Sequence, residues 1–436
     1  MDKIFRDWNV DDVWLFPPSI QELVPEKHLA NLVRDTVRNT LDLSAILDEY
    51  REVRGYPPYH PTMMTALLLY SYCTGIYSSR RIARACEERI DFMAVTAMQK
   101  PDFRTISEFR KRHLGALSGL FLQVLNLCRR AGLVKLGHVA LDGTKIRANA
   151  SRHKAMSYGR MKEKEPQLAA EVAKWMSTAN TEDGVEDGKF GRENRGDEMP
   201  EWVASKEKRA EKMRTAMAEL EAEARIEAKE KASKAGKSTR SKEVRDAKPD
   251  DKAQKNFTDP ESRIMKSSDG FIQAYNCQAA VDSENQIIVA QSVTNEGNDK
   301  RQLIPILNQI RANCRRQTVE LSADSGYCSE ANLAEVTKRR IAGYIATGRQ
   351  KHGERSATES TESHGGRHVR AMTTKLRRAG HRSRYRLRKI LPEPVFGQIK
   401  HGRGFRQFLL RGIRKVAGEW ALIATAHNFL KYAATA

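Results

Sequence analysis

Several features that define other protein classes are absent from the sequence. The chain of 436 residues has six cysteines, none of them in a CxxC pair or at a zinc-ligand spacing from a histidine, which argues against a zinc site or a disulfide framework. The longest apolar run lies near Ala66–Cys73 and is far shorter than the ~20 residues that span a bilayer. The first seven residues carry charges where a signal peptide needs an apolar core. We therefore expect a cytoplasmic protein with reduced cysteines and no membrane partner.

What the chain has in excess is positive charge. Its 76 Lys and Arg residues outnumber 55 Asp and Glu residues, for a net charge of +21. Such an excess favours long-range attraction to a polyanion such as nucleic acid. Ribosomal and membrane-surface proteins share this bias. The charge therefore indicates an anionic partner but does not indicate what reaction, if any, the protein catalyses.

Residues 1–132 have the periodicity of helices. Apolar residues recur at helical spacing from Met63 to Tyr72, after a start signal at His60–Thr62. A second helix is predicted near Ser78–Arg89. Its cations lie beside apolar positions, as in a helix that grips the DNA backbone; they are Arg80, Arg81 and Arg84. An ordinary helix with a solvated basic face would have the same pattern. We expect this region to be an all-helical DNA-binding domain.

The pattern changes to strand at Gly137. A strand at His138–Asp142 is followed by a predicted turn at Gly143–Thr144 and by Lys145–Ile146. Residues 151–268 are then rich in Glu, Lys, Ala and Arg, which predicts a charged, partly helical insertion. Helical composition is found at Ala169–Met176 and Glu201–Ala235, and polar loops are predicted at Thr178–Glu198 and Gly236–Asp259.

Strand signals return from Phe271. A hairpin is followed by a helix, a strand at Val319–Ala323, a helix opened by Ser329 and a strand at Ile341–Ala346. A basic stretch from Gly348 to Arg386, which we expect to be mobile, and a helical pattern from Phe405 to Leu430 complete the chain. This order predicts a mixed α/β fold, a mixed sheet flanked by helices, in the order of an RNase H-like fold interrupted after its first strand. The expected catalytic domain comprises residues 133–150 and 269–436.

Two aspartates have similar sequence contexts. Asp142 and Asp324 each follow a short apolar strand, and a glycine follows each within two residues. A carboxylate at a strand end, beside a glycine that lets another group come close, suits a metal site with oxygen ligands. An Asp that caps a turn has the same local pattern. Three further acids are better explained as such caps; they are Asp269, Asp282 and Asp299.

Glu393 is the third candidate acid. It lies between Pro392 and Pro394, so any helix must begin about there, since proline is tolerated only in the first turn. Taken alone, it is explained as a first-turn Glu favoured by the helix dipole. Three carboxylates together suit phosphoryl transfer, because two metal ions about 3.5 to 4 Å apart can activate the attacking oxygen and stabilise the leaving one. Hard cations such as Mg²⁺ prefer carboxylate oxygens.

The sequence resembles the bacterial insertion-sequence DDE transposases, which have an RNase H-like core and an all-helical N-terminal region. The resemblance covers nearly the whole chain. It rests on three segments, ALDGTK, ADSGY and EPVFGQIK, at Ala140–Lys145, Ala323–Tyr327 and Glu393–Lys400. Gly270–Gln278 and the charged insertion after the first strand support it. Each motif alone would be weak, but together they are highly specific.

This resemblance implies a role for each matched position. Asp142, Asp324 and Glu393 would be the catalytic triad and would bind two Mg²⁺ or Mn²⁺ ions. Lys400, seven residues after Glu393 and so on nearly the same helix face, would contact DNA phosphate near the cleavage site.

The family also has a Tyr and an Arg at fixed distances before the Glu. Tyr385 and Arg388 lie one residue further from Glu393 than that spacing, and Lys389 is found where the Arg would be. All three are candidate DNA contacts alongside Lys400.

The function implied is that of a transposase, which cuts the ends of its own element by metal-assisted hydrolysis and joins the freed 3′-hydroxyl to target DNA. Expected partners are the terminal inverted repeats, target DNA and further copies of the chain, because two ends must be brought together. Two alternatives remain open: a structure-selective metal-dependent nuclease without strand transfer, and a catalytically decayed DNA-binding protein.

Overall fold

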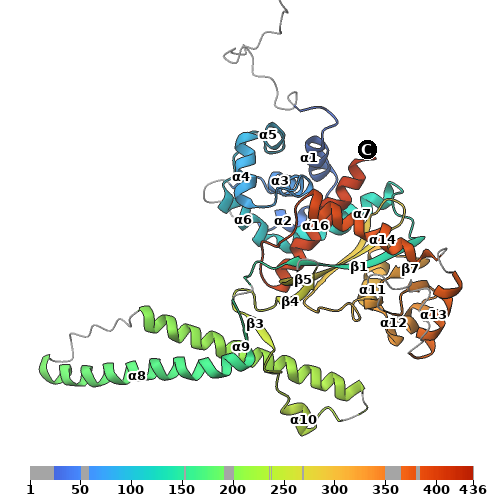
Figure 1. Ribbon diagram of the computed structural model, residues 1–436. Helices are drawn as coiled ribbons and strands as arrows, with labels where there is room; N and C mark the ends of the chain where they lie inside the picture. Colours follow the sequence, from blue (N-terminus) through green and yellow to red (C-terminus); the bar gives the residue numbers. More distant parts are fainter. Residues whose placement is uncertain are drawn as a thin grey trace, which may run out of the picture.

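The computed structural model describes residues 24–50, 58–151, 154–190, 201–234, 236, 238–267, 270–348, 365–379 and 383–435. Figure 1 shows a bundle of N-terminal helices, a sheet with helices around it, and a long arm that projects away from both. Parts of the sequence predictions lie outside the described residues: the loop residues 191–198, the basic stretch at 349–364, and Asp269.

Helices make up the whole described part of the N-terminal region. They are α1 (Leu29–Asn39), α2 (Ser44–Leu47), α3 (Pro61–Cys73), α4 (Ser79–Glu88), α5 (Ile90–Thr96), α6 (Phe103–Arg112) and α7 (Leu114–Arg130). The predicted start of α3 is confirmed, since the His60 ring accepts a hydrogen bond from the Thr62 backbone N–H at its first turn. The helix predicted near residues 78–89 is α4.

A mixed sheet forms the centre of the molecule. Its strands are β1 (His138–Arg147), β4 (Arg263–Ser267), β5 (Gly270–Asp282), β6 (Ile288–Thr294), β7 (Glu320–Ala323) and β8 (Ala342–Ile345). The order is β4-β5-β1-β7-β8, and β6 pairs with β5. β5 is antiparallel to β1, whereas β7 is parallel to β1 and β8 to β7. The predicted mixed sheet and the hairpin of β5 and β6 are therefore confirmed.

Helices α11 (Leu303–Cys314), α12 (Glu330–Lys338) and α13 (Arg367–Ala379) lie around β6, β7 and β8. The C-terminal helix α16 (Ile413–Ala433) packs against α7, α3 and β6, so one hydrophobic core runs from the N-terminal helices into the sheet. Trp420 of α16 is fully buried and donates its indole N–H to the Gln278 carbonyl oxygen of β5 at 3.2 Å.

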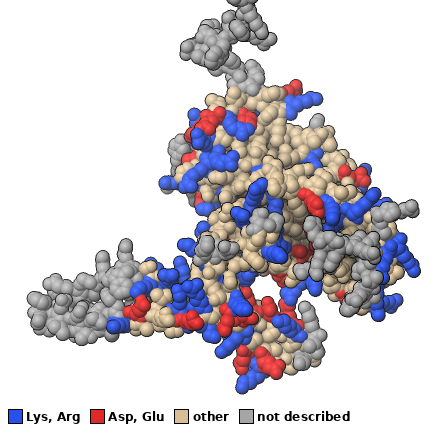
Figure 2. Space-filling model, viewed as in Figure 1, with Lys and Arg blue, Asp and Glu red and all other residues tan. Residues whose placement is uncertain are grey.

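The arm comprises residues 155–256: β2 (Ala155–Ser157), α8 (Tyr158–Phe190), α9 (Glu201–Lys234), α10 (Lys242–Arg245) and β3 (Gln254–Asn256). It has a small hydrophobic core of its own, in which Tyr158 and Met161 pack against Met213 and Leu220. Figure 2 shows Lys and Arg interleaved with Asp and Glu along it. The arm confirms the helices predicted in this segment, although α8 runs on to Phe190, through part of the predicted loop.

Three local predictions are wrong. No turn interrupts β1 at Gly143–Thr144, because both residues pair with β5 and the strand continues to Arg147. The basic stretch before Arg386 contains α13, whose apolar face packs on α12 and β8. The C-terminal helix begins at Ile413 and not at Phe405, because the segment before it pairs with the end of β1 at Gln407.

Candidate active site

Asp142 and Asp324 lie side by side in the sheet. In the parallel register of β1 and β7, Leu141 pairs with Ala323, so the next residue on each strand is an aspartate. The Asp142 carboxylate accepts the backbone N–H of Gly143 and the Asp324 carboxylate that of Gly326, both at 2.8 Å. The structure thus brings together the two acids that the sequence singled out.

Both carboxylates are costly to ionise where they lie. Burial raises the pKa of Asp142 to about 7, and repulsion from Asp324 adds to the shift, while the Arg388 guanidinium opposes it. Burial also raises the pKa of Asp324, again opposed by Arg388. Buried acids that repel each other have a high affinity for a divalent cation, since the cation relieves both effects.

Arg388 supplies the positive charge next to the pair. It lies in α14 (Leu387–Ile390), which packs on β1 and β7, and its Nε is buried and has no hydrogen-bond partner among the described residues. The phenol of Tyr385 interacts with Arg388, which opposes the rise that burial causes in the pKa of Tyr385. Lys389, the next residue, is exposed.

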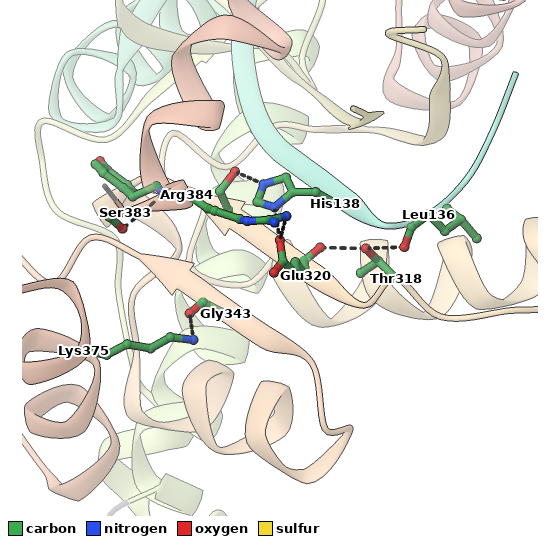
Figure 3. Close-up of polar contacts among 10 residues, drawn as sticks. Leu136, His138, Thr318, Glu320, Gly343, Lys375, Ser383 and Arg384 are labelled. Carbon is green, nitrogen blue, oxygen red and sulfur yellow. Dashed lines mark hydrogen bonds and ion pairs between the residues drawn. The ribbon is translucent and has the colours of Figure 1, made fainter. Parts of the chain in front are cut away.

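A polar network anchors the segment that carries Arg388. Arg384, in the short helix η4 (Arg384–Arg386), forms an ion pair with Glu320 of β7 at 2.6 Å. The Glu320 carboxylate also contacts His138 Nδ1 at 3.1 Å (Figure 3). On the other side of the ring, His138 Nε2 lies 2.9 Å from the hydroxyl of Ser322. These contacts hold η4 at the start of β1 and β7, and the chain then runs along the strands to Arg388.

Glu393 does not complete a metal site with the two aspartates. It is exposed in the first turn of α15 (Pro392–Gly397), and no three acids of the described residues, Glu393 included, are grouped closely enough to hold a metal ion. The helix start predicted from the flanking prolines is confirmed. α15 packs on β1 and β5, and the π-helical turn η5 (Gln398–Gly402) follows, with Lys400 half-buried within it.

Asp299 is a third acid beside the aspartate pair that sequence reasoning missed. It was predicted to be a cap, but α11 begins at Leu303 without a side-chain cap. The Asp299 Oδ1 instead accepts hydrogen bonds from the amide groups of Asn276 and Gln278 of β5, both at 2.7 Å. The Asp299 carboxylate raises the pKa of Asp142 and Asp324, after the larger effect of burial. A signal was present: both amides lie in the segment Gly270–Gln278, which the family resemblance includes.

The predicted DNA-binding cations Arg80, Arg81 and Arg84 are all exposed on α4. Arg80 lies over the Phe103 ring, 5.0 Å from its centroid, and Arg84 pairs with Glu88 at 2.7 Å. α4 packs on α5 and α6, among the N-terminal helices.

The donors around Asp142 and Asp324 suit a hard divalent cation, because they are carboxylate and amide oxygens on buried walls. Among the described residues, no three Asp, Glu, His or Cys side chains lie close enough together to form a ready metal site. The two aspartates therefore fit as part of a metal site that needs further ligands.

A mixed sheet of this order, with paired acids on its central strands, is the mark of the RNase H-like phosphoryl-transfer enzymes. Two family models match the chain: "Transposase domain (DUF772)" over residues 18–112 and "Transposase DDE domain" over residues 241–429. The chain is an insertion-sequence DDE transposase, as the sequence resemblance implied. Asp324 and Glu393 lie inside the second match, and Asp142 lies between the two. No curated protein and no solved structure gives a significant match.

Membership of this family implies DNA binding, and enzymes of the family generally use divalent metal ions. No helix in the described ranges combines the length and the apolar character needed to cross a membrane.

Proposed function

We propose that this transposase cleaves DNA at the ends of its own element and transfers the freed 3′-hydroxyl to target DNA. The observation that carries the proposal is the parallel register of β1 and β7, which holds two half-buried acids next to each other, with the half-buried guanidinium of Arg388 beside them. Phosphoryl transfer needs such a site, because the charge that develops on the phosphate oxygens must be stabilised at fixed positions.

Asp142, Asp324 and Glu393 are proposed to hold two Mg²⁺ or Mn²⁺ ions. When bound, the ions activate the attacking oxygen and stabilise the leaving oxygen. Glu393 is exposed on α15 and forms no ready metal site with the aspartates, so we propose that it joins them when DNA lies across the sheet edge. The two aspartates serve both the cleavage and the joining step.

Several basic residues are proposed to bind DNA phosphates at the site. Arg388 lies against the two aspartates, and Lys400 is half-buried in η5 after Glu393. Lys389 and Tyr385 flank Arg388 and would orient the same strand. The charge of Arg388, which attracts the two carboxylates, would then act on a phosphate once cations neutralise the acids.

We propose further that the chain is divided as its sequence suggests. Residues 1–132 bind DNA through α4, with Arg80, Arg81 and Arg84 on the backbone; residues 133–150 and 269–436 are catalytic; residues 151–268 are an insertion. Two element ends must be handled together, so the active form on DNA is a homo-oligomer in a bacterial cytoplasm.

Incubation of the purified protein with a pre-cleaved, 3′-hydroxyl element end and a target plasmid in Mg²⁺ tests this function. A transposase produces a joined end–plasmid molecule. Cleavage of an uncut end without any joined product would instead identify a structure-selective nuclease. Sequence-specific binding without metal-dependent cleavage would identify a decayed copy that only binds DNA.

A further inference from the structure

The loop before α11 brings a fourth carboxylate to the edge of the sheet where Asp142 and Asp324 lie. β6 is antiparallel to β5 and therefore runs in the same direction as β1, so the loop that follows β6 emerges at the end of the sheet toward which β1 and β7 run. Asp299 belongs to this loop, and its side chain is mostly buried, with 16% exposed.

One carboxylate oxygen of Asp299 is held by hydrogen bonds. Its Oδ1 accepts two amide N–H groups at 2.7 Å, from Asn276 and Gln278, and lies 4.0 Å from the Lys145 ammonium. Gln278 is itself held, because its amide oxygen accepts the hydroxyl of the buried Tyr327. The carboxylate is therefore fixed in one orientation by groups on the central strands.

The other oxygen is turned toward the aspartates. Asp299 Oδ2 accepts no hydrogen bond in the described part of the chain. It lies 3.2 Å from the point where a Cβ on Gly326 would be, and Asp324 Oδ1 lies 2.9 Å from the same point. Both carboxylate oxygens therefore border the small space that this glycine leaves open.

A second glycine leaves a matching space on β1. A Cβ on Gly143 would lie 3.0 Å from Asp299 Oδ1 and 2.9 Å from Asn276 Oδ1. Asn276 is fully buried, and its Oδ1 has no hydrogen-bond partner among the described residues. The Asn276 oxygen and the anchored Asp299 carboxylate are both ligand types that hard cations prefer. A cation, or a water molecule bound to it, would give the buried Asn276 oxygen the partner that it lacks.

We propose that Asp299 is a ligand of the divalent metal site, binding through Oδ2 to an ion shared with Asp324. The inference rests on the proposed function, since it assumes that Asp142 and Asp324 bind metal. It gives a role to an acid that lies beside the two aspartates in the DNA-free protein, in which Glu393 is exposed. Asp299 then binds the first ion before DNA arrives.

Asp299→Asn is a selective test. An asparagine oxygen can still accept both amide N–H groups, so the loop keeps its anchor and only the free oxygen is replaced. Mn²⁺ binding to the DNA-free, full-length protein is measured by electron paramagnetic resonance. We expect Asp299→Asn to weaken Mn²⁺ binding about tenfold or more, with an unchanged thermal midpoint. Glu296→Gln, in the same loop and paired with Arg301 at 3.1 Å, is the matched control and should bind Mn²⁺ as the wild type does.

Gly326→Ala tests the geometry independently. Its backbone is not in the left-handed region, so alanine adds no backbone strain. Its methyl would lie 2.9 Å from Asp324 Oδ1 and 3.2 Å from Asp299 Oδ2, so the two carboxylates must shift from their positions. It should weaken Mn²⁺ binding as Asp299→Asn does. Wild-type Mn²⁺ affinity in Asp299→Asn would overturn the proposal, provided that Asp142→Asn and Asp324→Asn lose binding. If those two variants also bind Mn²⁺ normally, the metal site of the proposed function is wrong as well.

Discussion

Leu141 and Ala323 pair in parallel register, and this pairing sets Asp142 and Asp324 next to each other with no loop between them and their strands. Strand pairing is a rigid support, so the distance between the two acids is fixed by the fold. The repulsion between them is therefore built into the DNA-free protein and is relieved only by a cation or a proton.

Asp142→Asn should stabilise the protein in a pH-dependent way. Burial raises the pKa of Asp142 from 3.8 to about 7 in the folded chain, so the folded state binds the proton more tightly than the unfolded state does. Wild-type stability should then fall as pH rises from about 4 to about 7. Above that range it should level off, because the carboxyl group is then ionised in both the folded and the unfolded state.

The expected gain from Asp142→Asn is at most about 4 kcal/mol at pH 8 and close to zero at pH 4. Urea unfolding in metal-free buffer at a series of pH values measures it. The exposed Asp246→Asn serves as control and should show no such trend. A gain that is constant across the pH range would show that the Asp142 carboxylate is not strained by burial.

Arg388→Gln should move metal binding to higher pH. The guanidinium lowers the pKa of both aspartates against the effect of burial, so its loss raises them further and protons compete with Mn²⁺ up to higher pH. We expect the pH of half-maximal Mn²⁺ binding to rise by about one unit. Arg386→Gln, exposed two residues earlier, should leave the profile in place. A shift to lower pH would mean that the repulsion between Arg388 and the metal ion outweighs the effect of Arg388 on the pKa of the two aspartates.

Trp420→Phe should cost about 1 to 2 kcal/mol of stability. Phenylalanine fills most of the buried space but leaves the Gln278 carbonyl oxygen without its donor. Denaturant unfolding measures the loss, and Leu122→Ala, at a side chain that is 42% exposed on α7, should change stability by less than about 0.5 kcal/mol. Equal losses for the two variants would contradict the role given to the indole N–H.

Arg81→Ala should weaken DNA binding for every sequence alike. If Arg81 neutralises one phosphate, its loss reduces the slope of log affinity against log salt by about 0.9. Fluorescence anisotropy at several salt concentrations measures this slope. Arg311→Ala, at an exposed position on α11, is the control. An unchanged slope for Arg81→Ala would show that α4 does not contact the DNA backbone.

The strands that carry the aspartates could be predicted from the sequence, because each is a short apolar run that ends in Asp with Gly close behind. The place of Asp299 could not, because its carboxylate is held by Asn276 and Gln278, more than twenty residues away on another strand. The continuation of β1 past Gly143 could not be predicted either, because a Gly–Thr pair is typical of a turn. The glycine is required here because β5 side chains occupy the place where its Cβ would be, and this is known only from the structure.

Helix α13 shows a different limit. Its many cations led to the prediction of a mobile stretch, yet Val369, Thr373 and Leu376 recur at helical spacing and are all buried. That stripe was a usable signal, but the surrounding positive charge obscured it. The exposed position of Glu393 depends on how α14 and α15 meet at Leu391, which no local pattern defines.

The most direct test of the account is cleavage of a duplex that carries the inverted repeat flanking the gene, in Mg²⁺, by the wild type and by Asp142→Asn and Asp324→Asn. The account predicts that both variants lose cleavage while their affinity for the duplex stays within about twofold of the wild type, since neither carboxylate is proposed to bind DNA. Undiminished cleavage by either variant would contradict it.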